Sequence, residues 1–228
     1  MIATPALTAL TAGQILYRGG SGAVIGRERF EIAHHAGGHT LRALCEMDDI
    51  ALLRDVTVSL DTAWRPFDAF CRISRAGVVE ATTWFGVEDD AVRVEGMVAG
   101  KRIVQSLPTD GRCAYLGLHP LQGDALIVTQ RGEDEPGAFR TVQGITNSIS
   151  PNGDVGLDGV PVAIDVAFVG HEPIVVAAGR FEARRYALRW SPEWPPADVW
   201  VRAHDCVVLK MQWSLIDNWY ELAELDER

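Results

Sequence analysis

Four residues of this sequence are of types that transfer protons and stand at positions where they could do so: Glu28, Tyr115, His119 and His171. His119 and His171 each follow an apolar, strand-like run and come shortly before a proline, which predicts that both lie where strands end. Tyr115 precedes His119 by four residues. Imidazole, carboxyl and phenol groups serve as general acids and bases, so we expect these four as catalytic residues. A structural hydrogen bond is the commoner role of a histidine in such a place.

Charged side chains also occur at positions that alternate with apolar ones. Glu28 alternates with Phe30, and Arg184 with Tyr186, so each pair shares one face of a strand. A buried charge without a partner costs several kcal/mol, so such a residue lines a wet cavity, meets an opposite charge, or lies on a solvated face after all. Burial would raise the pKa of Glu28 and suit it to the role of an acid.

Basic and aromatic residues predict a binding site for an aromatic carboxylate. Arginine pairs with a carboxylate through two parallel hydrogen bonds, and lysine can hold it as a point charge. Tryptophans usually pack in a core, yet together with stray charges they also describe a pocket for a ring-shaped ligand. The expected substrate-binding residues are Arg72, Trp84, Arg184, Tyr186, Lys210 and Trp213.

Lys210 raises a particular question, because it stands in the apolar run VVLKMQWSL. Leu209, Met211 and Trp213 alternate with Lys210 and Gln212, so the strand has one apolar and one polar face. If a curled sheet turns its polar face inward, Lys210 projects into the cavity. If the concave face is the apolar one, Lys210 is merely solvated.

The familiar catalytic motifs are missing from the sequence. It contains no nucleophile elbow, no phosphate-binding loop, no dinucleotide fingerprint and no zinc-protease motif, so we expect no cofactor. His34, His35 and His39 cluster at a predicted hairpin tip without a nearby carboxylate, which favours a solvated turn over a metal site. We therefore predict no metal.

The composition and charge of the chain restrict the classes of partner that we expect it to bind. The formal net charge of -10 opposes binding to nucleic acids and to anionic membranes. No apolar run reaches the roughly 20 residues that span a bilayer, and the N-terminal segment lacks the basic start of a signal peptide, which indicates a cytoplasmic protein. The four cysteines are widely spaced and are expected to be reduced core residues. A small molecule is the expected partner, and a homodimer stays open.

The elements that must position these residues are strands. Runs of six to ten residues rich in Val, Ile, Thr, Phe and Trp recur between turn residues, which is typical of an antiparallel all-β chain. We expect one domain over 1–228, with a meander at 23–107, an irregular crossover and loop at 108–160 that caps the structure, and closing strands at 161–225. A sandwich is an alternative, but a long meander favours one sheet curled into a barrel or half-barrel.

The C-terminal third resembles the DUF3108-like bacterial β-proteins of unassigned function. AAGRFEARRYAL, DVWV and VVLKMQWSLIDNWYEL are similar to that family's succession of strands, and YRGGSGAVIGRERFEI is similar to its first strand. The resemblance implies a long antiparallel sheet curled into a half-open barrel. It implies no catalytic residues.

Two function classes follow from these observations. The first is a cofactor-independent lyase or isomerase that moves protons on a small apolar or aromatic carboxylate, in steps such as decarboxylation, dehydration or isomerisation. The second is a lipocalin-like carrier, which needs only shape and apolar area. The carrier is simpler, but a cytoplasmic protein has less need to shuttle an apolar compound, so the enzyme is the favoured expectation.

Overall fold

Alternation of apolar and polar residues produces the long strands of this protein, as predicted. The computed structural model describes residues 7–228. In β4 (Leu52–Leu60) every second side chain is buried, and the residues between them face the other side of the sheet. β5 (Pro66–Arg75) and β6 (Val78–Val87) continue the pattern across short turns. Each strand thus has an inner, apolar face and an outer, mostly polar one.

The strands of residues 7–228 belong to one 15-stranded sheet in the order β8-β7-β6-β5-β4-β3-β2-β1-β15-β14-β13-β12-β11-β10-β9. Neighbours are antiparallel, except that β9 runs parallel to β10. β15 pairs with β1, so the C-terminal strands extend the sheet from the first strand of the chain. The remaining strands are β1 (Leu7–Arg18), β2 (Val24–His35), β3 (Gly38–Met47), β7 (Ala91–Val98), β8 (Lys101–Pro108), β9 (Leu116–Gly117), β10 (Phe139–Thr146), β11 (Val160–Val176), β12 (Gly179–Arg189), β13 (Ala197–Arg202), β14 (Val208–Trp213) and β15 (Asn218–Glu227).

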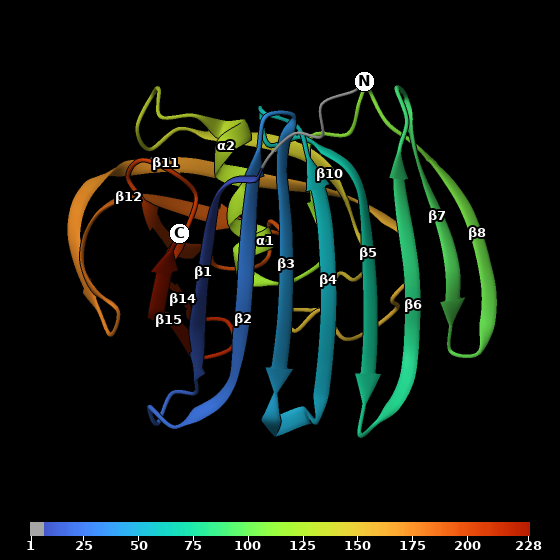
Figure 1. The fold of residues 1–228 in the computed structure, drawn as a ribbon, viewed down its shortest axis with the longest axis horizontal. Coiled ribbons are helices and arrows are strands. Elements are labelled where there is room, and N and C mark those ends of the chain that lie inside the picture. The colour runs from blue at the N-terminus through green and yellow to red at the C-terminus, as the bar shows by residue number, and fades with distance from the viewer. Residues whose placement is uncertain (1–6) are drawn as a thin grey trace.

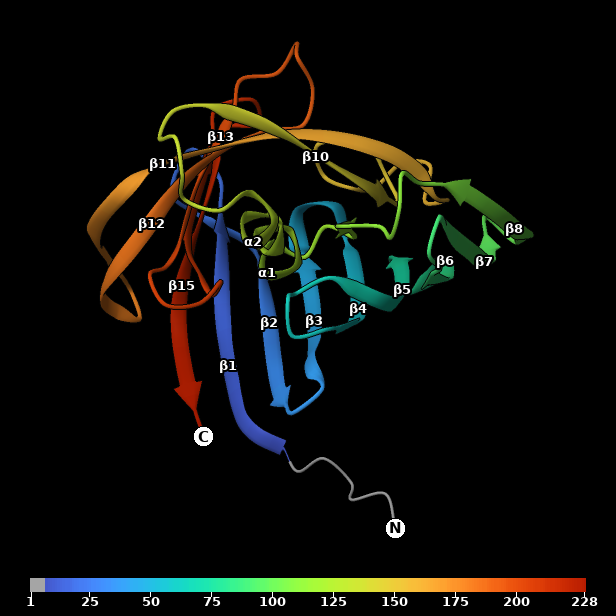
Figure 2. The ribbon, with the colours of Figure 1, turned by 90° about the horizontal axis from the view of Figure 1, so that it is seen from above.

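The sheet curls so that its two halves face each other. In Figure 1 the strands β1 to β8 form the near wall, and β11 and β12 cross behind them. Figure 2, seen from above, shows the two short helices enclosed between these walls. The terminal strands β8 and β9 are not neighbours in the sheet, so the barrel stays open. This confirms the expectation of an all-β, curled sheet of barrel-like shape.

Gln105 bridges the open seam. Its amide Nε2 donates to the carbonyl of Gly159 at 3.1 Å, and its Oε1 accepts from the Gly159 N–H at 2.9 Å. Gly159 lies so close to β7 and β8 that a Cβ there would come within 2.6 Å of Val94 Cγ2. One side chain of β8 therefore makes the pair of hydrogen bonds that a neighbouring strand would otherwise make with this backbone.

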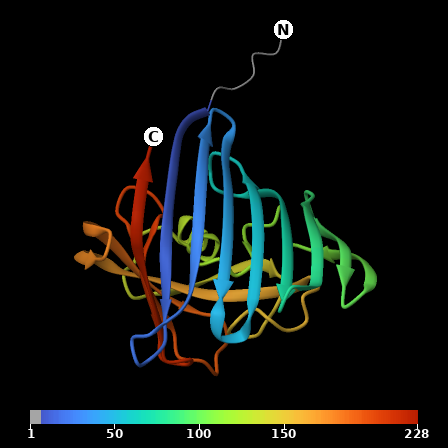
Figure 3. The same cartoon turned by 60° about the horizontal axis from the view of Figure 1, so that its bottom comes forward.

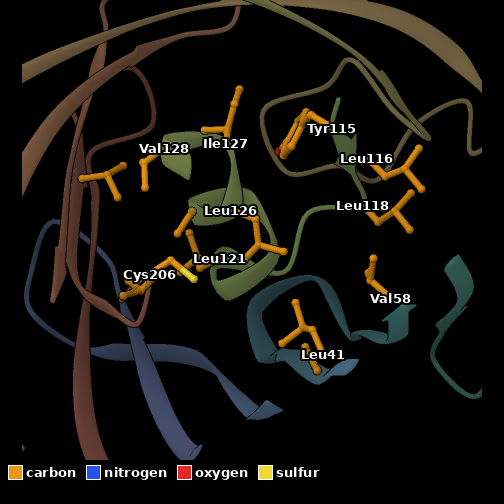
Figure 4. Packing of buried hydrophobic residues seen from close by; sticks show 14 of the residues in the cluster. Leu41, Val58, Tyr115, Leu116, Leu118, Leu121, Leu126, Ile127, Val128 and Cys206 are labelled. Atoms are coloured by element: carbon orange, nitrogen blue, oxygen red, sulfur yellow. The ribbon is translucent and has the colours of Figure 1, made fainter. Parts of the chain in front are cut away.

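Part of the segment 108–160 lies in the interior of the curled sheet, where the sequence predicted a cap. It holds α1 (Leu121–Asp124), the 3-10 turn η2 (Ala125–Ile127) and α2 (Val128–Arg131), whose apolar side chains are buried. Figure 4 shows Leu121, Leu126 and Ile127 packed inside the curled sheet, with Leu41 of β3 beside them. We call residues 121–131 the plug. The segment also contains β10, a strand that the sequence did not suggest.

Two further features complete the fold. A 3-10 turn, η1 (Asp48–Ile50), joins β3 to β4, and Figure 3 shows β1, β2 and β15 side by side along the wall. The four cysteines are free and buried, as predicted. Within residues 7–228, none of the helices is long and apolar enough to cross a bilayer.

Candidate functional site

A cavity of about 360 Å³ lies on the concave side of the sheet, between the start of the plug and the C-terminal strands. Three tryptophans form one of its walls. Trp213 of β14 lies with its ring centroid 5.1 Å from that of Trp190 and 5.6 Å from that of Trp194. The indole N–H of Trp213 donates to the carbonyl of Pro195 at 2.8 Å, which fixes its orientation. This wall is rigid, apolar and aromatic.

The opposing polar groups of the cavity are Tyr115 and Asp124. The Tyr115 hydroxyl donates to Asp124 Oδ1 at 2.8 Å. Burial raises the pKa of Asp124 to about 7, and the nearby Glu28 adds to the rise, whereas Tyr115 and Arg54 oppose it. Burial and the Asp124 charge raise the pKa of Tyr115 well above its usual range. Asp124 is thus a carboxyl group poised between its two protonation states near neutral pH.

His119 also lines the cavity, but its ring is engaged. Its Nε2 lies 3.0 Å from the carbonyl of Ser148 and 3.3 Å from Thr146 Oγ1. Burial and the positive charge of Arg54 lower the pKa of His119 to about 3, so the ring is neutral at pH 7 and donates from Nε2 to the carbonyl. His119 therefore holds the backbone at 146–148. This is the structural hydrogen bond that we expected from the sequence as the alternative to a catalytic role.

Glu28 lies behind the cavity, fully buried. Its carboxylate accepts hydrogen bonds from the backbone N–H groups of Leu121 and Gln122, at 2.7 and 3.0 Å, and from the Tyr17 hydroxyl at 2.8 Å. The pKa of Glu28 is raised, because burial outweighs these hydrogen bonds. Glu28 therefore ties the plug to β2, while Tyr17, its partner, lines the cavity.

Three of the predicted substrate-binding residues lie on the outer face of the sheet. Lys210 projects away from the cavity, with its ammonium 5.4 Å from the centre of the Trp200 ring. Trp84 is 40% exposed, and Arg72 is exposed beside the Phe70 ring. The concave face is therefore the apolar one, and Lys210 is a solvated residue because its neighbours Met211 and Trp213 take the inner face.

The remaining predicted residues gather elsewhere, near α2. His171 and Arg184 contact the two carboxylate oxygens of Glu133 at 2.8 and 3.1 Å. Tyr186 is buried against Phe168, at 5.3 Å between ring centroids. None of these residues lines the cavity. Of the ten predicted site residues, the structure brings Tyr115, His119 and Trp213 to the cavity, with Glu28 directly behind it.

Arg54 and Asp124 are among the residues of the site that were missed in the sequence. Arg54 is buried, and its guanidinium donates to the carbonyls of Asn152 and Gly153 at 3.1 and 2.8 Å, which fastens the loop over the cavity. Its position gave a usable signal, because Arg54 alternates with Leu52 and Val56 on the inner face of β4. Asp124 gave no such signal, since no periodic element surrounds it.

The histidines at the β2–β3 turn pack against each other. His34 Nδ1 lies 3.0 Å from His39 Nδ1, and the His39 ring stacks on Trp64 at 3.8 Å between ring centroids. Burial and the neighbouring His34 lower the pKa of His39 to about 4. The described part of the chain contains no group of three or more His, Cys, Asp or Glu side chains arranged to hold a metal ion.

Comparison with known proteins identifies a structural likeness only. No protein-family model matches the sequence, and no curated protein does. A solved structure that covers 99% of this chain, over 100% of its own length, is a β-barrel-like protein of the domain of unknown function DUF1849 from Brucella abortus, with 12% identity and a TM-score of 0.62. A Bacteroides fragilis protein with a YmcC-like fold covers 95% of each chain at 11% identity, with a TM-score of 0.33. The chain is thus similar in fold to a bacterial β-barrel-like protein of unknown function.

Proposed function

We propose that this protein binds a small, largely apolar molecule in its concave cavity, as a binding or carrier protein. The aromatic wall of Trp190, Trp194 and Trp213 supports the proposal, because it offers a rigid surface for a flat apolar body. The volume of about 360 Å³ falls in the range of small-molecule sites, roughly 300 to 1,000 Å³. A wall of this kind is sufficient for binding and needs no catalytic group.

Proton-transfer catalysis, by a lyase or isomerase, is the second candidate. Asp124 favours it, because a general acid or base works best when its pKa is near the working pH, and that of Asp124 is raised to about 7. Tyr115 stands next to it as a hydrogen-bond donor. His119 contributes less to this candidate, since its Nε2 is engaged with a backbone carbonyl.

Calorimetric titration with 2-naphthylmethanol, a bicyclic neutral compound, tests the binding proposal. Trp194 and Trp84 are both partly exposed, but only Trp194 lines the cavity. We expect Trp194→Ala to weaken binding about tenfold, because an aromatic contact with its buried area contributes about 1–2 kcal/mol. The control Trp84→Ala is expected to bind as the wild type does. Equal weakening by both variants, or no binding by the wild type, would contradict the proposal.

The two candidate functions separate in a single incubation. A carrier returns its ligand unchanged, whereas an enzyme converts it, and mass spectrometry of the released compound distinguishes these results.

We further propose that this protein belongs to the DUF3108-like group of bacterial β-proteins. The motifs AAGRFEARRYAL and VVLKMQWSLIDNWYEL support this proposal.

A further inference from the structure

The carboxyl group of Asp124 is available to a ligand. Asp124 ends α1 and lines the cavity, and its side chain is partly exposed there. Oδ1 accepts the Tyr115 hydroxyl at 2.8 Å. Within residues 7–228, Tyr115 is the side chain that donates to this carboxyl group, and the backbone N–H of His119 also interacts with it. A carboxylate oxygen can accept more than one hydrogen bond, so Oδ2 is the acceptor that the cavity offers to an incoming donor.

Cationic groups in the cavity are engaged with the protein itself. Arg54 is the arginine that lines it, and this side chain is 2% exposed. Its Nη1 and Nη2 atoms are directed at the backbone carbonyls of His119, Asn152 and Gly153. The Nε atom of Arg54 has no hydrogen-bond partner within residues 7–228 but is itself buried. Because Nη1 and Nη2 must lose their contacts with the carbonyls to pair with a ligand carboxylate, Arg54 is a poor anion receptor in this arrangement.

The other cations expected to bind a carboxylate lie outside the cavity. Arg72 and Lys210 are on the outer face, and Arg184 pairs with Glu133. The cavity therefore joins an aromatic wall to an accessible carboxyl oxygen. Tryptophan faces also attract cations through their negative π surface. Both walls favour the same kind of ligand.

We propose that the cavity selects an aromatic or alkyl amine, with its apolar body against Trp190, Trp194 and Trp213 and its amine nitrogen donating to Asp124 Oδ2. This inference rests on the proposed binding function and names the ligand class of the same site. Four groups modulate the charge of Asp124: the Tyr115 hydroxyl and the Arg54 guanidinium favour its ionised form, as does the backbone N–H of His119, whereas Glu28 opposes it. A bound ammonium adds a further charge that favours the carboxylate.

A matched ligand series tests the proposal. Titration calorimetry at pH 8 with 2-naphthylmethylamine, 2-naphthylmethanol and 2-naphthylacetic acid keeps the aromatic body constant and changes the polar group. We expect the amine to bind at least about tenfold more tightly than the alcohol, because a hydrogen bond to a charged group is stronger than a neutral one. The carboxylate is expected to bind most weakly.

Substitution of Asp124 tests whether this residue is the source of the preference for amines. Asp124→Asn is expected to reduce amine binding to the level of the alcohol and to leave alcohol binding within about threefold of the wild type. Asp165→Asn, which removes the same charge from β11 where Asp165 accepts a hydrogen bond from Thr141, is the control and should leave the amine preference intact. Lowering the pH from 8 to 6 protonates Asp124 and should weaken binding of the amine alone.

The results distinguish failure of the amine selectivity from failure of the binding function itself. Equal or tighter binding of the carboxylate by the wild type overturns the amine selectivity and leaves the binding function standing, as does an amine preference that survives in a folded Asp124→Asn variant. If none of the three compounds binds, the binding function itself fails, and the selectivity fails with it.

Discussion

Glu28 is predicted to hold the plug in place, and its removal should be among the most damaging single changes in this protein. Its carboxylate accepts hydrogen bonds from Leu121 N, Gln122 N and the Tyr17 hydroxyl, all in a fully buried setting. In Glu28→Ala these donors lose their acceptor. A buried unsatisfied donor costs about 1–3 kcal/mol. Allowing for relaxation and for the cost of burying the charge in the wild type, we expect a loss of about 3–5 kcal/mol.

Glu28→Gln is the sharper test, because it preserves shape. One oxygen becomes an NH₂ group that must face a backbone N–H of Leu121 or Gln122, so donor meets donor. We expect a loss of about 1–3 kcal/mol from one broken buried hydrogen bond. Domains of this kind are stable by only about 5–15 kcal/mol, so both losses are measurable.

Urea denaturation at pH 7, followed by circular dichroism and tryptophan fluorescence, measures these changes. The control is Glu31→Gln on the same strand, whose side chain is 54% exposed and lies 3.8 Å from Arg42. It should change the free energy of unfolding by less than about 0.5 kcal/mol. If Glu28→Gln is as stable as this control, the hydrogen bonds to the plug do not stabilise the fold and the reasoning is refuted.

Three further predictions concern pH and the seam. Because the pKa of Asp124 is raised to about 7, the native state binds its proton more tightly than the unfolded chain does, so the contribution of Asp124 to stability falls as pH rises from about 4 to about 7, and urea midpoints of Asp124→Asn measured between pH 5 and 8 should lack this contribution. His119, with its pKa lowered to about 3, acts in the other direction: its contribution falls as pH drops below about 6.5, and His119→Asn, which tolerates the φ of 70° there, should resist acid better in circular dichroism at pH 4. Gln105→Ala should speed amide exchange at Gly159 at least tenfold, and unchanged exchange would contradict the bridging role.

Local alternation made most of the strands predictable, although β1 and β10 were missed, and its absence made the plug unpredictable. β4 and β5 each bury alternate residues, so their inner faces could be assigned from sequence. Each plug helix spans only four residues, too short for a helical period, so 121–131 read as an irregular segment. The cavity depends on that segment, because Asp124 reaches it only when the plug lies inside the sheet.

Lys210 is a second example of what alternation in the sequence cannot predict. Its alternation with Met211 and Trp213 established two faces, but not which face the sheet curls toward. Curvature is a property of the whole sheet, fixed by what fills its interior, here the apolar plug. The sequence therefore assigned Lys210 and its neighbours correctly to opposite faces of the strand. Only the structure showed which of these faces lies on the concave side of the sheet.

The Gln105 bridge has a geometric consequence for the width of the molecule. In a closed barrel the radius follows from the number of strands and their shear, so it changes only in steps. Here Gln105 of β8 pairs with the backbone of Gly159, just before β11, and no ladder within residues 7–228 joins β8 to β9. The separation of these two ends is thus not restricted to the fixed steps of a closed barrel. We expect a substitution such as Gln105→Asn to alter the spacing between β8 and the start of β11 while the rest of the sheet keeps its register.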